Sequence, residues 1–175
     1  TKEFLFSGFG GQGILFAGKF IAYKGLTEGE QVSWLPSYGP EMRGGTASCG
    51  IIVSDGAVGS PIVAKPDILV AMNLPSLDRY EDAVKQGGMI FYDSSLIERP
   101  LRRTDVKAYA VPATRLAGEN GFPTLGNMIL VGKILAALGE YTDEGINAAL
   151  AKVISAKRAD MLEVNRKALE LGANY

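Results

Sequence analysis

The stretch Phe4-Leu5-Phe6-Ser7-Gly8-Phe9-Gly10-Gly11-Gln12-Gly13-Ile14 decides how this 175-residue chain begins to fold. A short apolar run stops at Gly8, which is typical of a buried strand. Beyond the glycines, apolar residues recur at helical spacing to about Tyr23, before Gly25. The sequence therefore predicts a strand, a tight turn and a helix, the context in which glycine-rich ligand-binding turns occur.

Further along the chain, strand-like and helix-like segments continue to alternate. Short apolar runs are typical of strands buried in a parallel sheet, and apolar residues three or four positions apart are typical of helices packed on it. The predicted strands cover residues 31–35, 67–72, 89–92 and 106–111. The predicted helices begin after the candidate cap Ser76, at residue 126, after the candidate cap Thr142 and at residue 160, the last ending at Gly172. The predicted fold class is α/β: an open, mostly parallel, doubly wound (Rossmann-like) sheet with helices on both faces, in a single domain over residues 1–175.

An antiparallel hairpin is predicted within this α/β pattern. Residues 46–54 and 57–63 are two strand-like runs that flank Asp55-Gly56. That dipeptide suits a tight hairpin turn because both residues tolerate a positive φ. The hairpin is therefore expected as an insertion in the otherwise parallel sheet.

Two residue types are nearly missing, and their scarcity limits the chemistry. The chain has no histidine and one cysteine, Cys49. A Ser–His–Asp triad, a Cys–His dyad, a His-ligated metal, an internal disulfide and a Cys₄ iron–sulfur cluster are therefore excluded within the chain. We expect no catalytic residue and no metal ligand in it.

The charge balance and the hydropathy pattern exclude two classes of partner. Eighteen Lys and Arg residues against nineteen Asp and Glu leave a formal net charge of −1, which gives no general attraction to nucleic acid or an anionic membrane. The apolar stretch 128–138 is interrupted by Lys133 and is shorter than the roughly 20 residues of a membrane helix, and no targeting segment is evident. We predict a cytoplasmic protein that binds neither nucleic acid nor membrane.

The glycine turn is the strongest candidate for a ligand site. Gly8, Gly10 and Gly13 match the G-x-G-x-x-G pattern, in which glycines admit a close backbone and free helix N–H groups face an anion. The carboxylate that would hold a ribose about 20 residues further on is missing, since residues 35–38 carry none. A dinucleotide is therefore disfavoured, while a phosphate-bearing ligand, a partner's backbone, or close helix–strand packing alone remain open.

Two further segments carry candidate residues. Tyr38-Gly39-Pro40-Glu41-Met42-Arg43-Gly44-Gly45 follows a strand, and so belongs at the carboxyl edge of the sheet, where doubly wound folds bind ligands. Arg43 offers a planar fork to phosphate or carboxylate beside bare glycine backbone, and Glu41 can orient it, although a solvated loop is the other interpretation. Asn127 places an amide at the start of a buried helix, either as a cap or as a ligand contact.

Together, these motifs resemble the gamma subunit, or gamma domain, of the 2-oxoacid:ferredoxin (acceptor) oxidoreductases. The resemblance rests on residues 8–13, residues 38–45, Pro66-Asp67-Ile68-Leu69-Val70-Ala71, Gly87-Gly88 and Gly126-Asn127, which occur in the family's order and spacing. They span most of the chain. The Gly-Gly-Gln-Gly motif followed by Tyr-Gly-Pro-Glu-x-Arg-Gly-Gly makes the match specific.

The resemblance implies a multi-subunit enzyme that decarboxylates a 2-oxoacid oxidatively, converting 2-oxoglutarate to succinyl-CoA in our interpretation, and passes electrons to ferredoxin. Thiamine diphosphate, magnesium and iron–sulfur clusters would lie on the alpha, beta and delta partner subunits, and this chain alone would hold no cofactor. Coenzyme A would bind at a shared site. Our hypothesis is that the cofactor-binding residues of this chain are Gly8, Gly10, Gly11, Gln12, Gly13, Tyr38, Glu41, Arg43, Gly44, Gly45 and Asn127.

Three other functions are compatible with the sequence. The small subunit of an indolepyruvate-type oxidoreductase is a close competitor that differs in its partners. An independent Rossmann protein would bind NAD(P) or FAD without any partner. A purely structural assembly subunit would fail to assemble when the glycine turn is changed, but the ligand affinity of any complex that still formed would not change.

Overall fold

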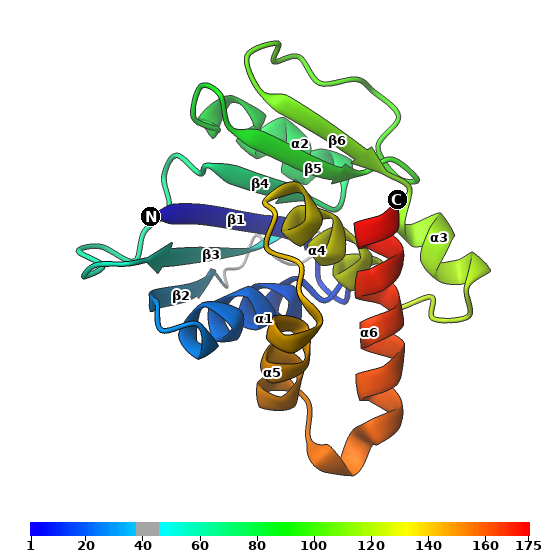
Figure 1. The fold of residues 1–175 in the computed structure, drawn as a ribbon. Coiled ribbons are helices and arrows are strands. Elements are labelled where there is room, and N and C mark those ends of the chain that lie inside the picture. The colour runs from blue at the N-terminus through cyan, green and yellow to red at the C-terminus, as the bar shows by residue number, and fades with distance from the viewer. Residues whose placement is uncertain (38–45) are drawn as a thin grey trace.

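A computed structural model of the chain describes residues 1–37 and 46–175, and these residues form one six-stranded sheet with helices packed on it (Figure 1). The strand order is β2-β3-β1-β4-β5-β6. The strands are β1 (Lys2–Phe9), β2 (Gln31–Ser37), β3 (Thr46–Ser54), β4 (Ile68–Ala71), β5 (Met89–Asp93) and β6 (Lys107–Val111). The helices are α1 (Ile14–Thr27), α2 (Leu74–Tyr80), α3 (Ala113–Glu119), α4 (Gly126–Ala137), α5 (Asp143–Val153) and α6 (Ala159–Asn174), with the one-turn 3₁₀ helices η2 (Glu81–Ala83) and η3 (Ala156–Arg158).

The sheet is mixed, and its parallel part is the larger one. Neighbouring pairs β1–β4, β4–β5 and β5–β6 are parallel, whereas β3 runs antiparallel to both β1 and β2. The predicted α/β class and open sheet are confirmed, and β6 lies at an edge as expected. No predicted element corresponds to α3, which begins directly after Pro112.

The predicted hairpin is right in its first strand and wrong in its second. Residues 46–54 form β3, but residues 57–63 form no strand. Both edges of β3 are already occupied, because Ile51 pairs with Trp34 of β2 on one side and with Phe4 of β1 on the other. Of this segment, Val63 packs over Gly50 on the face of β3 instead. The antiparallel element inserted in the sheet is therefore the single strand β3, which pairs with both β1 and β2.

The two faces of the sheet carry unequal layers. Side chains alternate along each strand, so Phe4 and Phe6 of β1 belong to the large core under α1, α4, α5 and α6, while Leu5 belongs to a smaller core under α2. The apolar helix predicted from residue 126 is α4. It is buried almost throughout because it packs between the sheet and α6. Figure 1 shows α4, α5 and α6 on the same side of the sheet as α1.

Three helix ends test the predicted capping residues. Thr142 caps α5 as expected, its hydroxyl accepting from the Gly145 N–H at 3.0 Å. The predicted cap Ser76 is wrong. The cap of α2 is Asn73, three residues earlier, whose carboxamide oxygen accepts from the Ser76 N–H at 2.9 Å. The predicted end at Gly172 is also wrong, since α6 continues to Asn174.

Gly172 allows the helices α4 and α6 to cross at close distance. A Cβ atom there would overlap the carbonyl oxygen of Ile129 in α4, and one at Gly132 would overlap the carbonyl oxygen of Leu169 in α6. The two backbones therefore touch directly, which only glycine permits. The glycine that suggests a helix end in the sequence is instead required inside the helix for packing.

Candidate functional site

The glycine turn lies where the direction of the crossovers reverses. β1 leads through the turn into α1 on one face of the sheet, whereas the adjacent parallel strand β4 leads into α2 on the opposite face. In open α/β sheets this switch point leaves a crevice at the carboxyl ends of the strands, where ligands bind. The structure therefore places the predicted glycine residues at the expected edge.

Three of the predicted residues hold the turn in shape. Gln12 accepts from the Phe9 N–H at 2.6 Å and donates to the Met72 carbonyl at 3.1 Å, so its amide joins the turn to the end of β4. A Cβ atom at Gly8 would lie 2.6 Å from the Gln12 carboxamide oxygen. Gly13 has a φ of +74° and lies against Asn127. We infer that these residues act by packing and hydrogen bonding.

Gly10 and Gly11 differ from their neighbours because they face open space. Both are exposed, and a Cβ atom at either would meet nothing within 4 Å. Directly behind them α1 begins at Ile14, with Gly13 at the N-cap position, no side-chain cap and no acidic residue in its first turn. The first N–H groups of a helix lack intrahelical acceptors and favour an anion. This side of the turn can therefore accept a phosphate.

Asn127 lies beside the glycine turn and holds it with a hydrogen bond. Its amide donates to the Gly13 carbonyl at 3.0 Å, although 114 positions separate the two residues in the sequence. It does not cap α4, whose N-cap is Leu125. The side chain is 3% exposed, and its carboxamide oxygen has no hydrogen-bond partner among the described residues.

Asn73 is a candidate that the sequence analysis missed. It follows β4 at the switch point and is 2% exposed. Its oxygen caps α2, but its NH₂ group is buried and unpaired within the described part of the chain. An unpaired buried donor is costly, but this one has less than 1 Å² of exposed surface, so a ligand would reach it only if neighbouring residues moved. The available signal was an amide directly after a buried strand.

Tyr38, Glu41, Arg43, Gly44 and Gly45 lie outside the described residues. Their neighbours in the chain are described: β2 ends at Ser37, and Thr46 at the start of β3 pairs with Phe9 at the end of β1. The two ends of segment 38–45 are therefore attached at the same edge of the sheet as the glycine turn.

The strand order argues against a dinucleotide site of the usual kind. In that fold the strand after the first crossover lies beside β1 and its end supplies the ribose-binding carboxylate. Here the antiparallel β3 separates β2 from β1. The end of β2 is displaced from the turn and carries no acidic residue through Ser37. Both observations disfavour NAD(P) or FAD.

Cys49 is a core residue, as its alternation with Ala47 and Ile51 predicts. Its side chain is fully buried in β3, against Gly18 of α1. Burial raises the pKa of the Cys49 thiol to about 12, although a hydrogen bond with Trp34 acts in the opposite direction. A thiol with this pKa stays protonated at neutral pH and is a poor nucleophile or metal ligand.

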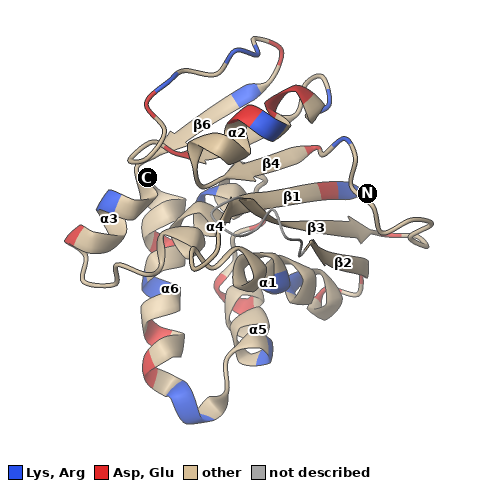
Figure 2. Cartoon of the chain, turned by 180° about the vertical axis from the view of Figure 1, so that it is seen from behind, with Lys and Arg blue, Asp and Glu red and all other residues tan. Residues whose placement is uncertain are grey.

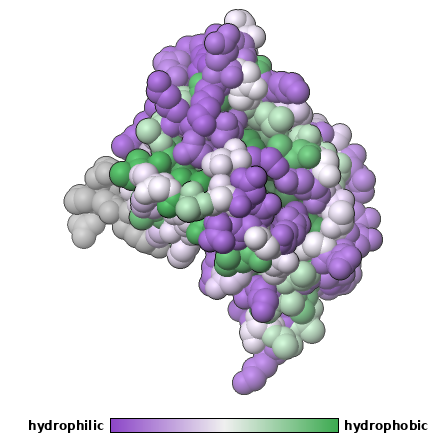
Figure 3. Space-filling view, turned by 60° about the vertical axis from the view of Figure 1, so that its left-hand side comes forward, coloured by the Kyte–Doolittle hydropathy of each residue, from purple (hydrophilic) through white to green (hydrophobic). Residues whose placement is uncertain are grey.

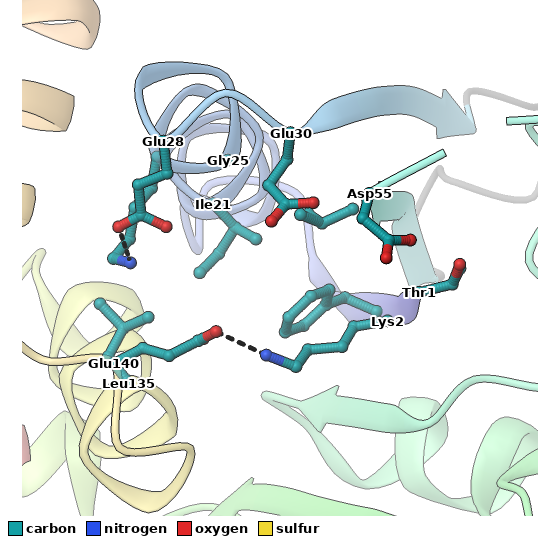
Figure 4. A pocket seen from close by; sticks show the side chains of 12 residues that line it. Thr1, Lys2, Ile21, Gly25, Glu28, Glu30, Asp55, Leu135 and Glu140 are labelled. Atoms are coloured by element: carbon teal, nitrogen blue, oxygen red, sulfur yellow. Dashed lines mark hydrogen bonds and ion pairs between the residues drawn. The ribbon is translucent and has the colours of Figure 1, made fainter. Parts of the chain in front are cut away.

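A separate hollow of about 220 Å³ lies at the opposite, amino end of the parallel strands (Figure 4). Figure 4 shows Lys2 directed at Glu140, and Glu28 at the top of the view, whose carboxylate accepts from the Lys24 ammonium at 2.6 Å. In the described ranges no three His, Cys, Asp or Glu side chains are placed to hold a metal ion. None of the described helices is long and apolar enough to cross a bilayer.

Exposed apolar side chains follow several strands at the carboxyl edge. Phe9 ends β1, Leu35 lies near the end of β2, Leu74 follows β4 and Leu96 follows β5, and each is between 39% and 43% exposed. Figure 3 shows hydrophobic surface beside the residues drawn in grey. Apolar surface gathered around a candidate site is typical of an interface with another chain.

Comparison with known proteins identifies the family. A profile described as pyruvate ferredoxin/flavodoxin oxidoreductase matches residues 3–175. Ketoisovalerate oxidoreductase subunit VorA of Methanothermobacter thermautotrophicus is 41% identical over 170 residues, which cover 97% of this chain and 35% of VorA. 2-Oxoglutarate synthase subunit KorC of Methanocaldococcus jannaschii is 34% identical over 152 residues, covering 85% of this chain and 81% of KorC. The chain thus spans about a third of VorA but most of KorC.

Solved structures agree with the sequence matches. The gamma subunit of a keto/oxoacid ferredoxin oxidoreductase from Geobacter sulfurreducens superposes with a TM-score of 0.85 at 30% identity, covering 99% of this chain and 97% of that one. The 2-oxoglutarate:ferredoxin oxidoreductase of Magnetococcus marinus, solved with 2-oxoglutarate, coenzyme A and succinyl-CoA bound, shares the fold at a TM-score of 0.86 and 24% identity, and this chain covers 31% of its length. The chain therefore belongs to the pyruvate ferredoxin/flavodoxin oxidoreductase family, which confirms the resemblance seen in the sequence motifs.

Proposed function

We propose that the chain is the gamma subunit, or gamma domain, of a multi-subunit 2-oxoacid:ferredoxin oxidoreductase. The relatives that match it over most of their length are subunits of such enzymes. Alpha, beta and delta partners would carry thiamine diphosphate, magnesium and the iron–sulfur clusters, and ferredoxin would receive electrons from the complex. A cytoplasmic location belongs to the same proposal, and the single protonated Cys49 is compatible with it.

The role proposed for this chain is to form one side of a coenzyme A site. The observation that carries it is the open side of Gly10 and Gly11 at the uncapped start of α1. Free N–H groups at a helix start are suited to phosphate oxygens. Bound coenzyme A supplies the thiol that receives the acyl group, and the residues of this chain would position it.

For the substrate we propose 2-oxoglutarate, which would be converted to succinyl-CoA. The proposal is supported by four relatives named 2-oxoglutarate synthase subunit KorC, which are 31–38% identical over 79–95% of this chain. Assays of the purified complex with 2-oxoglutarate, ketoisovalerate and pyruvate test this choice. The highest kcat/KM for ketoisovalerate or pyruvate would overturn it.

The partner proposal is supported by the apolar residues Phe9, Leu35, Leu74 and Leu96 around the carboxyl edge. We expect partner subunits to cover this edge, because surfaces of this kind are usually buried in a complex. The test is to purify the chain from its native cell extract. Co-purification of thiamine diphosphate and iron–sulfur proteins is expected, and recovery of the chain alone would contradict the proposal.

The substitution Gly10→Val tests the coenzyme A site directly. The new side chain meets no neighbouring atom at Cβ, and Gly10 has no positive φ, so folding and assembly should not change. The valine side chain would occupy the space through which a ligand approaches the backbone of the turn. We expect KM for coenzyme A in the reconstituted complex to rise at least about tenfold, which corresponds to roughly 1.4 kcal/mol, with little change in kcat.

Gly59→Val is the matched control. Gly59 also has open space at its Cβ position and no positive φ, but it lies in the loop after β3, away from the glycine turn. A complex reconstituted with Gly59→Val should have the same KM for coenzyme A as a complex with the unchanged chain. If Gly10→Val assembles normally and has the same KM as Gly59→Val, the turn does not contact coenzyme A.

A further inference from the structure

The strand β2 forms one end of the sheet, and its outer edge pairs with no other described strand (Figure 1). Its inner edge pairs with β3 along the whole strand, from Gln31 to Ser37. An unpaired strand edge presents a row of backbone N–H and C=O groups to which another strand can bind. Unless it is protected, the outer edge of β2 is therefore a site for strand pairing.

Most of the features that protect edge strands are missing from β2. The strand has seven residues, none of which is charged, so it is neither short nor guarded by charge. Trp34 and Leu35 are 41% and 43% exposed. Pro36 has no N–H to donate and would interrupt a further ladder near the end of the strand. At the other end of the sheet, β6 has five residues and begins with the exposed Lys107. The residues of β2 that can pair are therefore 31–35.

The side chains of β2 divide between the two faces of the sheet. Val32 packs on the large core under α1. Trp34 lies on the same face, because it pairs with the core residue Ile51 and forms a side-chain hydrogen bond with Cys49. Side chains alternate along a strand, so Ser33 lies on the opposite face. The α1 face of the edge is therefore apolar, and the other face has a small polar side chain at the centre of the pairing residues.

We propose that β2 pairs with β2 of a second copy of this chain, antiparallel and about a two-fold axis at Ser33. An antiparallel pair of identical strands is self-complementary, and it uses the free β2 edge of both copies, so the assembly closes at a dimer. In this register Val32 of each copy lies opposite Trp34 of the other. Pairs of a β-branched and an aromatic side chain stabilise neighbouring strands. The two six-stranded sheets would become one continuous sheet.

Charge and geometry favour a second copy as the occupant. β2 has no charge with which to select an oppositely charged strand. Glu30 directly precedes the strand, so the two Glu30 side chains would lie at opposite ends of the paired strands and would not repel each other. Both β1 and β2 are antiparallel to β3, so β2 runs parallel to β1. Two antiparallel copies therefore direct their carboxyl edges away from each other, and both glycine turns stay open to coenzyme A and to partner subunits. The dimer goes beyond the proposed function without conflicting with it.

Sedimentation equilibrium of the purified 175-residue chain tests the proposal. Small interfaces bind weakly, so we expect a monomer–dimer equilibrium at concentrations of about 1–300 μM. Trp34 is the only tryptophan of the chain. Its fluorescence should shift to shorter wavelength over the same concentrations, because the second strand removes the indole from water. A chain that stays monomeric throughout this range, or that associates beyond a dimer without limit, would overturn the proposal.

Charge exchange at Ser33 tests the register. Ser33 is partly exposed and would face Ser33 of the other copy across the axis. Ser33→Lys and Ser33→Glu each place like charges opposite one another, so the dissociation constant of either dimer should rise at least about tenfold. An equimolar mixture of the two variants places lysine opposite glutamate and should restore the affinity of the unchanged chain. Damage to the fold of a single variant would not be repaired by mixing.

Ser60→Lys is the matched control. Ser60 is exposed and lies in the loop after β3, so a lysine there adds the same charge outside β2 and should leave dimerisation unchanged. Thermal melting of each variant establishes that it is folded. Equal dimer affinity of Ser33→Lys and Ser60→Lys, or a mixture that dimerises no better than its two components alone, would overturn the assignment. KM for coenzyme A after the Gly10→Val substitution tests the proposed function separately, so either proposal can fail while the other stands.

Discussion

Gly132→Ala is expected to destabilise the chain by about 3 kcal/mol, the upper range for overpacking a core. Gly132 lies in the middle of α4, and a Cβ atom there would overlap the Leu169 carbonyl oxygen and lie 2.9 Å from the Leu169 Cα in α6. Backbone atoms cannot rotate away as side chains do, so the helices must separate. Thermal unfolding should shift downward by about 6–12 °C for a domain of this size.

Gly118→Ala is the control for this prediction, because it makes the same substitution in a helix without the contact. Gly118 lies in α3, and a Cβ atom there would meet nothing within 4 Å. Alanine should stabilise that helix slightly, by about 0.5–1 kcal/mol at most. The two Gly→Ala substitutions should therefore have opposite signs. A Gly132→Ala variant as stable as the Gly118→Ala variant would show that α4 and α6 do not cross at backbone contact.

Local sequence patterns predicted the parallel strands correctly. They failed for residues 57–63, because both edges of the strand that these residues were expected to pair with are already occupied. The apolar runs at β4 and β5 have no other satisfactory place than a buried sheet, and both were found within one residue of the predicted bounds. Asp55-Gly56 favours a hairpin locally, yet β2 and β1 occupy both edges of β3. Strand pairing depends on residues distant in sequence, which a local turn signal does not contain.

The sequence predicted where the glycine turn lies in the fold, but not the different roles of its residues. The glycine spacing indicates a turn at the sheet edge, and the structure has that turn. The pattern does not distinguish Gly10, which faces open space, from Gly8, which is needed for contact with Gln12. It also cannot show that the Asn127 amide reaches Gly13 across 114 positions. These distinctions come from tertiary contacts.

Glu81→Gln is expected to destabilise the chain by about 3 kcal/mol, at the low end for breaking a buried charge network because several of its arginines contact solvent. The Glu81 side chain is fully buried. One of its oxygens accepts the backbone N–H groups of Arg102 and Arg103, the latter at 3.0 Å, and the other accepts from the Arg99 guanidinium at 2.8 Å. Figure 2 shows charges of both signs around α2 and the chain before β6. A glutamine keeps the shape but turns an NH₂ group toward donors.

The pH dependence of this loss identifies the carboxylate as its cause. Burial raises the pKa of Glu81, but the hydrogen bonds from Arg103, Arg99 and Arg102 outweigh burial and hold the pKa below its ordinary value of 4.5. A lowered pKa in the folded state stabilises the fold fully above the pKa of the unfolded chain, and the stabilisation is lost as the pH falls through the folded pKa. Urea unfolding should therefore show a gap between the unchanged chain and Glu81→Gln that is constant near neutral pH and narrows below pH 4.5.

Glu163→Gln provides the comparison within the same chain. Its carboxylate pairs with Arg166 at 2.9 Å on the exposed side of α6, with more than half of the Glu163 side chain in solvent. Such a surface pair contributes less than about 1 kcal/mol, so this variant should unfold near the unchanged chain at every pH. If Glu81→Gln also unfolds near the unchanged chain at neutral pH, water must already supply the hydrogen-bond acceptors of Arg99, Arg102 and Arg103. If the stability gap between the unchanged chain and Glu81→Gln keeps the same width at acid pH, the loss of stability comes from shape and hydrogen bonding. A loss caused by the missing negative charge must shrink as the Glu81 carboxylate of the unchanged chain is protonated.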